Sequence, residues 1–206
     1  MKERSGGEVV AVAPDAEGAD DMLFAAAARG ADQLMKLTGD FENGVNNHAM
    51  ARALTTVVPA LEPDLILTGV QAHDDLDGSL GPLLAEYLGM PYVGYISGVS
   101  LGEGRSIVRK EYPGGLMAEL EVNLPAVLGI QSADQPPRYV AISKIRQAMK
   151  MASIGEHKVA ELDPGGGPTV SRMFQPETGD RATMIEGDEE EVAARLIKMF
   201  QEAGLV

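Results

Sequence analysis

The residues that could do chemistry gather in one polar loop that follows a short apolar run. Three aspartates, Asp74, Asp75 and Asp77, precede two small residues, Gly78 and Ser79. Small residues ahead of a helix let a phosphate group approach the first backbone N–H groups, and the positive end of the helix dipole favours it. The carboxylates could instead hold Mg²⁺. An ordinary solvated turn has the same composition, so the loop alone leaves all three interpretations open.

A strand before the loop and a helix after it must position these residues. Leu65–Leu67 is a short apolar run that indicates a buried strand, and leucines recur at helical spacing from Leu80 to Leu88, before Gly89. Ligands of open α/β sheets bind where a strand's carboxyl end meets a helix N-terminus. This strand–loop–helix unit is therefore the candidate binding element.

Two similar units precede it. Glu8–Pro14 and Gln33–Leu37 are predicted strands, the first helix ends near Gly30, and a second helix is expected over 46–58. The alternating order predicts an α/β fold with a parallel sheet, helices on both faces and right-handed crossovers.

After Pro91 the pattern predicts strands without helices. They are expected over 92–101, 106–112 and 117–130, joined by glycine-containing turns. In the last of them the first half alternates imperfectly and the second half is continuously apolar. This predicts one long bent strand, exposed first and buried later, with Pro125 at the bend or at an edge position.

The C-terminal part is expected to form an arm. A short helix is predicted over 143–151, a domain boundary between 153 and 154, and an arm rich in Gly and Pro over 154–206. The acidic run Asp188–Glu191 suits the first turn of a final helix, which Gly204 should end. Its apolar stripe needs a surface to lie on, either in its own domain or in a partner subunit.

Composition excludes several classes of function. With 17 basic and 31 acidic residues the formal net charge is −14, which argues against nucleic acid and anionic membrane surfaces. The absence of Cys excludes disulfides, cysteine-ligated metals and a thiol nucleophile. No apolar run is long enough to span a membrane, so a soluble, cytoplasmic protein is expected. The histidines show no metal-ligand spacing and no nucleophile–base set stands out, so no catalytic residue is proposed.

One segment is rich in scarce basic residues. RYVAISKIRQAMK, at 138–150, surrounds Val140, Ile142 and Ile145 with positive charge. It could be an amphipathic helix that packs its apolar side on the sheet. It could also be a docking loop, an apolar anchor within a basic surface, suited to an acidic partner.

Several segments together resemble the beta (small) subunit of electron transfer flavoproteins. They are GADQLMKL at 30–37, DLILTGVQAHDD at 64–75, GPLLAEYLGMPYV at 81–93, LPAVLGI at 124–130, PRYVAISKIRQAMK at 137–150 and IEGDEEEVAARLIKMFQEAGLV at 185–206. Their common order over nearly the whole chain is more specific than any single match.

The resemblance implies an adenine-nucleotide-binding, Rossmann-like fold with extra antiparallel strands and an arm that embraces the alpha (large) subunit. It implies an electron carrier rather than a catalytic enzyme, with FAD held by or shared with that partner and AMP or a second FAD on this subunit. The implied nucleotide site comprises Gly69, Gln71, Ala72, Asp74, Asp75, Gly78, Ser79, Leu80 and Gly81. The implied surface for a dehydrogenase electron donor comprises Arg138, Tyr139, Ile142, Lys144 and Arg146.

The chain departs from the family pattern in several places. Gly78-Ser79-Leu80 stands where an Asn-Gln-Thr-type phosphate turn is usual, and the basic run after the docking segment is reduced to Arg146 and Lys150. The family's first strand, which lies between the strands at Glu8–Pro14 and Asp64–Gly69, has no counterpart. Those two strands must then pair with each other, accept a strand from elsewhere, or belong to a chain that starts upstream of Met1. The last outcome is the expectation, with residues 1–206 alone loosely folded.

Two other functions remain open on the sequence. A nucleotide-binding regulatory module would bind AMP or ATP without flavin. A structural partner subunit would pair with a large subunit and bind no nucleotide.

Overall fold

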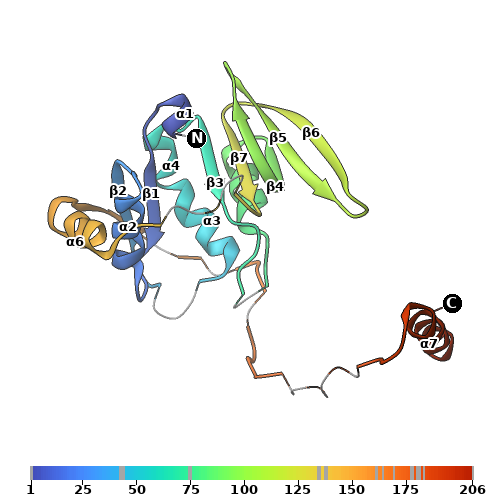
Figure 1. Ribbon diagram of the computed structural model, residues 1–206. Coiled ribbons are helices and arrows are strands. Elements are labelled where there is room, and N and C mark those ends of the chain that lie inside the picture. The colour runs from blue at the N-terminus through green and yellow to red at the C-terminus, as the bar shows by residue number, and fades with distance from the viewer. Residues whose placement is uncertain are drawn as a thin grey trace. The chain divides into compact units, whose positions relative to one another are not determined.

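The computed structural model describes residues 2–41, 45–73, 76–133, 136, 139–160, 162–163, 165–168, 170–176, 179, 182 and 184–205. The chain forms two compact units, Met1–Val170 and Ser171–Val206. The first unit contains two β-sheets and most of the helices (Figure 1).

The first sheet has three parallel strands in the order β1-β2-β8. They are β1 (Val10–Pro14), β2 (Gln33–Thr38) and β8 (Ile154–Lys158). Helix α2 (Ala19–Ala28) packs against β1 and β2, and α6 (Ile142–Met151) packs against α2. The sequence analysis predicted β1, β2 and both helices but not β8, which lies within the segment assigned to the arm.

The second sheet has five strands in the order β3-β7-β4-β5-β6. They are β3 (Leu65–Thr68), β4 (Tyr92–Leu101), β5 (Arg105–Tyr112), β6 (Leu116–Asn123) and β7 (Ala126–Ile130). The strands β3, β7 and β4 are parallel, whereas β5 and β6 are added antiparallel. Helix α5 (Leu80–Leu88) packs against β4, β7 and α3 (Asn47–Thr55). This mixed architecture confirms the predicted α/β class with extra antiparallel strands.

The prediction of one bent strand over 117–130 is wrong. After β6, at the edge of the sheet, the chain crosses to the middle, where β7 pairs with β3 and β4. The crossing occurs at Leu124-Pro125, a cis peptide bond. The half-exposed pattern of the first part belongs to an edge strand, and the continuously apolar AVLGI belongs to a strand covered on both faces.

Each sheet borders its own cluster of buried side chains. The first cluster consists of Leu37, Phe41, Ala53, Val57, Val58 and Val159. Ala53 belongs to α3, Val58 to the short helix α4 (Val58–Leu61) and Leu37 to β2, and the other three lie in adjoining loops. The second cluster consists of Ile96, Val108, Val122, Ala126 and Leu128, all of which lie in the five-stranded sheet. Val12 of β1 and Ile66 of β3 both pack against the first cluster.

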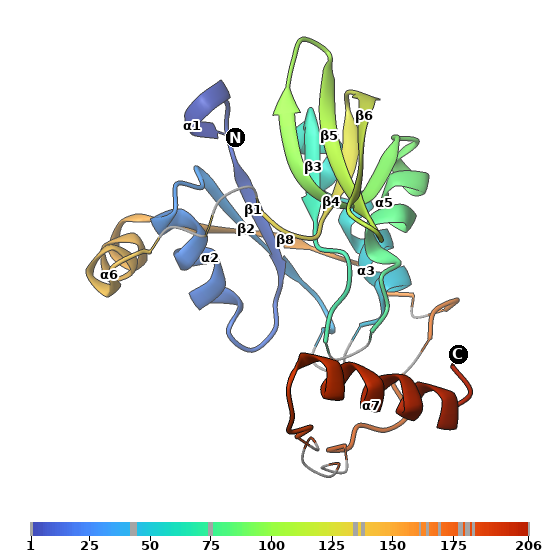
Figure 2. The ribbon, with the colours of Figure 1, turned by 45° about the vertical axis from the view of Figure 1, so that its right-hand side comes forward.

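The edges of β1 and β3 do not pair with each other in the described part of the chain. β1 pairs only with β2, and β3 only with β7 (Figures 1 and 2). In parallel pairs, alternate residues direct their N–H and C=O groups to opposite sides. Because Asp15 donates to Leu37 and Ala126 to Asp64, the backbone groups of Val10, Val12, Leu65 and Leu67 point away from the paired strands. Of the three outcomes expected for the missing strand, direct pairing of its neighbours is not what the structure shows.

The N-terminal segment is tied to the first sheet. Residues Lys2–Ser5 form α1, and the chain leaves it through Gly6 and Gly7, both with positive φ. The Lys2 ammonium forms an ion pair with Asp32 at 2.5 Å and also donates to the Gly30 carbonyl.

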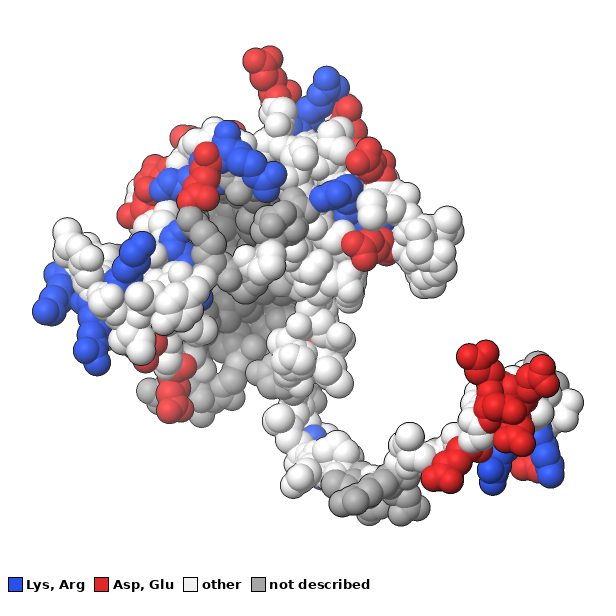
Figure 3. Space-filling view, viewed as in Figure 1, with Lys and Arg blue, Asp and Glu red and all other residues white. Residues whose placement is uncertain are grey.

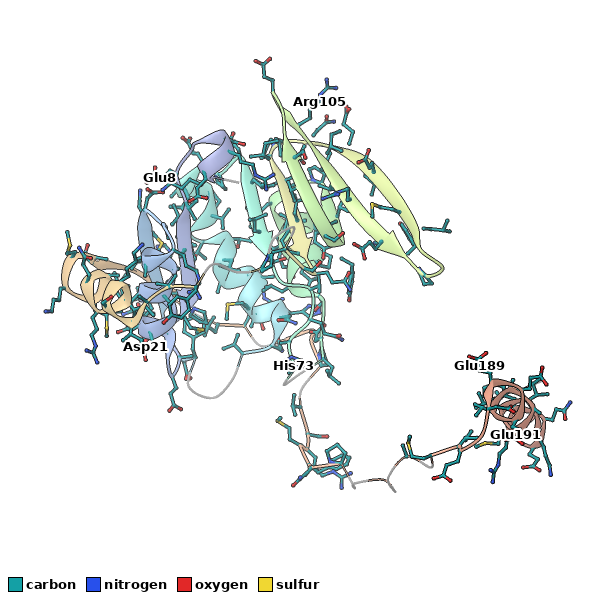
Figure 4. All side chains as sticks on the ribbon, in the orientation of Figure 1. Glu8, Asp21, His73, Arg105, Glu189 and Glu191 are labelled. Atoms are coloured by element: carbon teal, nitrogen blue, oxygen red, sulfur yellow. The ribbon has the colours of Figure 1, made fainter. Side chains whose placement is uncertain are left out.

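The second unit contains α7 (Glu189–Glu202). Asp188 caps it by accepting from the Glu191 N–H at 2.9 Å, and the Glu191 carboxylate accepts from the Asp188 N–H. The acidic first turn, labelled by Glu189 and Glu191 in Figure 4, forms the red face of this helix in Figure 3. No residue of α7 is buried. The final helix with its acidic start and its end near Gly204 is confirmed.

Candidate functional site

The loop after β3 is held in place by its own short contacts. A Cβ on Gly78 would lie 2.6 Å from the Val70 carbonyl oxygen, so only glycine fits where the loop returns to its start. The Gln71 side-chain amide donates to the Leu76 carbonyl at 2.5 Å, and Leu76 itself has a positive φ of 55°. Asn47 of α3 donates to the Asp77 carbonyl at 2.8 Å. The loop therefore reaches the start of α5 in a defined conformation.

The first turn of α5 offers backbone donors beside a carboxylate. The N–H groups of Leu80 and Gly81 precede the first hydrogen bond within the helix, which Leu83 makes to Ser79. Asp77 lies next to them, because it accepts from the Ser79 N–H at 3.0 Å and from the Ser79 hydroxyl at 2.9 Å. An incoming phosphate would meet both these N–H groups, which have no intrahelical partner, and this negative charge.

Three glycines beside this turn surround the side chain of Tyr92. A Cβ on Gly81 would lie 2.7 Å from the Tyr92 ring, and one on Gly129 would lie 2.6 Å from its hydroxyl oxygen. A Cβ on Gly94 would also meet that hydroxyl. Burial raises the pKa of the Tyr92 phenol, and the nearby Tyr95 adds to the shift. The glycines therefore allow a large phenol to lie between the sheet and α5.

The Thr68 hydroxyl lies beside the same turn. Its oxygen would be 2.9 Å from a Cβ on Gly81, and the Tyr92 hydroxyl oxygen would be 3.1 Å from the same point. Within the described part of the chain, the Thr68 Oγ1 is buried and has no hydrogen-bond partner. Sequence reasoning missed both hydroxyls, because no local motif links residues 68, 81, 92 and 129.

The loop brings together the predicted residues that the structure describes. These are Gly69, Gln71, Ala72, Gly78, Ser79, Leu80 and Gly81, while Asp74 and Asp75 lie outside the described residues. His73 is exposed in the outer part of the loop (Figure 4). Among the described residues there is no group of three His, Asp or Glu that could hold a metal ion.

The predicted docking segment lies on α6, which packs on α2 beside the other sheet. Tyr139 is 88% exposed and Ile142, the first residue of α6, is 65% exposed. Lys144 and Arg146 are also exposed, whereas Ile145 is half-buried. The basic residues of α6 form the blue group at the left of Figure 3. Arg138 lies outside the described residues. The helix thus packs partly through Ile145 and leaves Ile142 uncovered.

Comparison with known proteins identifies the family. A model of the electron transfer flavoprotein domain matches residues 1–162, which is most of the chain. The chain belongs to the electron transfer flavoprotein family. Its relatives place it among the beta subunits of that family, and a role in electron transfer within a flavin-containing complex follows from this membership.

Three relatives of this electron transfer flavoprotein subunit show how far the similarity extends. It is 34% identical over 204 residues to the electron transfer flavoprotein subunit beta of Methylophilus methylotrophus, covering 95% of this chain and 77% of that protein. It is 30% identical over 215 residues to protein FixA of Azorhizobium caulinodans, with coverages of 96% and 76%. It is 28% identical over 213 residues to the caffeyl-CoA reductase–Etf complex subunit CarD of Acetobacterium woodii, with coverages of 99% and 81%.

No helix in the described part of this electron transfer flavoprotein subunit is both long and apolar enough to cross a membrane.

Proposed function

We propose that this chain is the small subunit of a heterodimeric electron transfer flavoprotein. It carries electrons from dehydrogenases to a downstream acceptor through FAD that the alpha (large) subunit holds or shares. Its own loop after β3 binds a nucleotide, which is AMP or a second FAD. The family match over residues 1–162 is the observation that carries the proposal.

The residues around the loop fit a nucleotide phosphate. Gly78 and Gly81 leave no Cβ in the way, and the Leu80 and Gly81 N–H groups belong to the unbonded first turn of a nine-residue helix. The buried, unpartnered Thr68 hydroxyl beside the turn is a further donor. The helix dipole adds about 0.3–1 kcal/mol for an anion at such a position. The negative charge of the Asp77 carboxylate opposes phosphate binding, so this side chain would have to release Ser79 or turn away from the phosphate.

The protein side chains act by binding and orientation. FAD supplies the redox chemistry when it is bound, since flavins accept and release electrons. The turn at Gly78–Gly81 fixes the phosphate of the nucleotide. Around the exposed Ile142, the positive charges of Lys144 and Arg146 favour encounter with an acidic surface of a dehydrogenase.

The C-terminal arm serves assembly in this proposal. Beyond residue 153 it ends in α7, whose large apolar residues Leu196, Ile197, Met199 and Phe200 are all exposed. An amphipathic helix with an uncovered apolar face needs a surface to bury it. The alpha subunit is the proposed surface.

Asp77 favours a second candidate function. Because its carboxylate already lies at the start of α5, the turn could be complete without a phosphate. The chain would then be a structural partner subunit that assembles with the large subunit and binds no nucleotide.

Co-purification with the large subunit tests the proposal. After co-expression, the complex is denatured and the released flavin and nucleotide are identified by mass spectrometry. We expect FAD in an amount equal to the heterodimer, together with AMP or a second equivalent of FAD. FAD without a further nucleotide would support the structural subunit, and failure to form a complex would contradict both.

A glycine pair tests the loop itself. Gly78→Val would displace the Val70 carbonyl, so it should weaken nucleotide binding by misplacing the turn. Gly155→Ala is the control, because a Cβ there has its nearest neighbour at 3.6 Å and Gly155 lies on β8 of the other sheet. Equal binding by both variants in calorimetry would show that the loop is not the site.

A further inference from the structure

The first turn of α5 has two hydroxyl groups beside it that the described chain does not satisfy. The Thr68 Oγ1 is buried without a hydrogen-bond partner, and the structure records no hydrogen bond for the Tyr92 hydroxyl among the described residues. Leaving a buried hydroxyl unsatisfied costs about 1–3 kcal/mol. Such a group is expected to have a partner that is not part of the chain.

Both hydroxyls lie beside Gly81 in the first turn of α5. Thr68 ends β3 and Tyr92 begins β4, yet their oxygens lie 2.9 Å and 3.1 Å from the position that a Cβ on Gly81 would occupy. Gly94 and Gly129 make room for the Tyr92 ring to reach this point. The position of the Tyr92 hydroxyl beside α5 therefore depends on three glycines from three elements, Gly81, Gly94 and Gly129.

We propose that Thr68 and Tyr92 donate hydrogen bonds to the phosphate group of the nucleotide bound at the first turn of α5. The inference rests on the proposed nucleotide-binding function and names the side chains that recognise the charged part of the ligand. The turn Gly78-Ser79-Leu80 provides only backbone groups and one serine hydroxyl, which is already donated to Asp77. The two hydroxyls supply the side-chain donors that this turn lacks.

The raised pKa of Tyr92 agrees with this role. A phenol that stays protonated over a wider pH range remains a donor to an anion, whereas a phenolate would repel it. Burial of the Thr68 hydroxyl also lowers the competition from water, so a hydrogen bond from it to a charged oxygen is strong.

The test removes each hydroxyl with little change in side-chain shape, through Thr68→Val and Tyr92→Phe. Both substitutions are made in the full chain, which is co-purified with its large subunit where the two assemble. Calorimetry measures the binding of AMP and of adenosine, which lacks the phosphate. Each variant should bind AMP about tenfold more weakly or worse, as expected for a lost hydrogen bond to a charged group. Adenosine binding should stay unchanged.

Thermal melting without ligand separates ligand recognition from a structural role. Removing an unsatisfied buried hydroxyl should leave the melting temperature equal or higher. Ser106→Ala is the control, because its buried hydroxyl is also unpartnered within the described chain but lies on β5. This control should melt at or above the wild-type temperature and bind AMP normally.

Three results would overturn the inference. A lower melting temperature of both hydroxyl variants without ligand would make the hydroxyls structural. Normal AMP affinity in both variants would show that they meet an internal water or nothing, and the nucleotide site would stand without them. If the wild-type protein binds neither AMP nor FAD, the proposed nucleotide site fails and this subsite fails with it.

Discussion

The two sheets of the first unit differ in the origin of their buried side chains. The five-stranded sheet contributes every member of its cluster, from Ile96 on β4 to Leu128 on β7. The three-stranded sheet contributes only Leu37 from its strands, and the rest of its cluster comes from α3, α4 and adjoining loops. Ile66 of β3, from the other sheet, packs on that same cluster.

This difference predicts different local stability. The five-stranded sheet has a core of its own and carries the candidate nucleotide loop between β3 and α5. The three-stranded sheet relies on helices that it shares with β3, and α6, the proposed docking helix, packs on it through α2. Segments with fewer buried contacts open at lower free energy. A ligand turn benefits from the more rigid support, whereas a docking helix tolerates the looser one.

The largest effect is expected at the open edges of β1 and β3. A parallel strand between them would satisfy the outward-facing backbone groups of Val10, Val12, Leu65 and Leu67, which lie in partly buried or exposed residues, at about 0.5–1.5 kcal/mol for each hydrogen bond formed. Residues 1–206 alone should therefore be loosely folded. An added strand that pairs with both edges should stabilise the chain more than any single substitution.

Amide hydrogen exchange measures this prediction residue by residue. In residues 1–206 the amides of these four positions should exchange much faster than those that face β2 or β7, and an added strand should slow them. A sharp cooperative melt of 1–206 alone, with all strand amides protected, would contradict the prediction.

Substituting one glycine in each sheet should give the next largest effect, a change in the free energy of unfolding. A Cβ on Gly129 of β7 would lie 2.6 Å from the Tyr92 hydroxyl and 3.1 Å from the Gly94 Cα, whereas one on Gly155 of β8 has its nearest neighbour at 3.6 Å. Gly129→Ala should cost about 1–3 kcal/mol through overpacking. Gly155→Ala should be neutral or stabilising by up to about 1 kcal/mol.

Urea unfolding of the two variants checks this pair. Equal free energies of unfolding would show that the five-stranded sheet is no more tightly packed than the three-stranded one. The proposed difference in packing between the two sheets would then be wrong.

Two isoleucines on α6 test the proposed docking surface. Ile142→Ala should weaken dehydrogenase binding by about 2 kcal/mol or more, as for an interface anchor, and should leave the melting temperature unchanged because Ile142 is exposed. Ile145→Ala removes a half-buried neighbour on the same helix, so it should lower stability and spare electron transfer. Reduction rates with the cognate dehydrogenase and melting curves distinguish the two. A lower melting temperature for Ile142→Ala with a normal rate would make Ile142 a packing residue.

The sequence predicted the elements whose pattern is local. The strands β1, β2 and β3 and the helices α2, α5, α6 and α7 follow from apolar runs, periodicity and caps. It did not predict β8, because IGEHK has neither a clear alternation nor an apolar run. It joined β6 and β7, because an apolar pattern shows that a strand is buried but not which strands it pairs with.

The candidate site likewise has a part that the sequence predicted and a part that it did not. The loop and its small residues could be recognised from the chain, because they are consecutive. The meeting of Thr68, Gly81, Tyr92 and Gly129 could not, because it depends on how β3, α5, β4 and β7 pack. The carboxylate of Asp77 was visible as a charge, but its bond to the Ser79 N–H depends on the folded turn.

The smallest effect is expected at the exposed ion pair that ties α1 to the three-stranded sheet. Hydrogen bonds from Lys2 and from the Val9 N–H hold the pKa of Asp32 below its usual value of 3.8. A carboxylate with a lowered pKa contributes stability above its unfolded pKa, and this contribution is lost as pH falls through the folded value. Between pH 5 and pH 2, roughly, the Val9 amide should therefore exchange faster relative to amides of the five-stranded sheet. Asp32→Asn should abolish that pH dependence, because asparagine has no charge to lose. Identical acid profiles for the wild type and the variant would show that the ion pair does not hold this edge of the three-stranded sheet, and another carboxylate would have to account for any loss of protection.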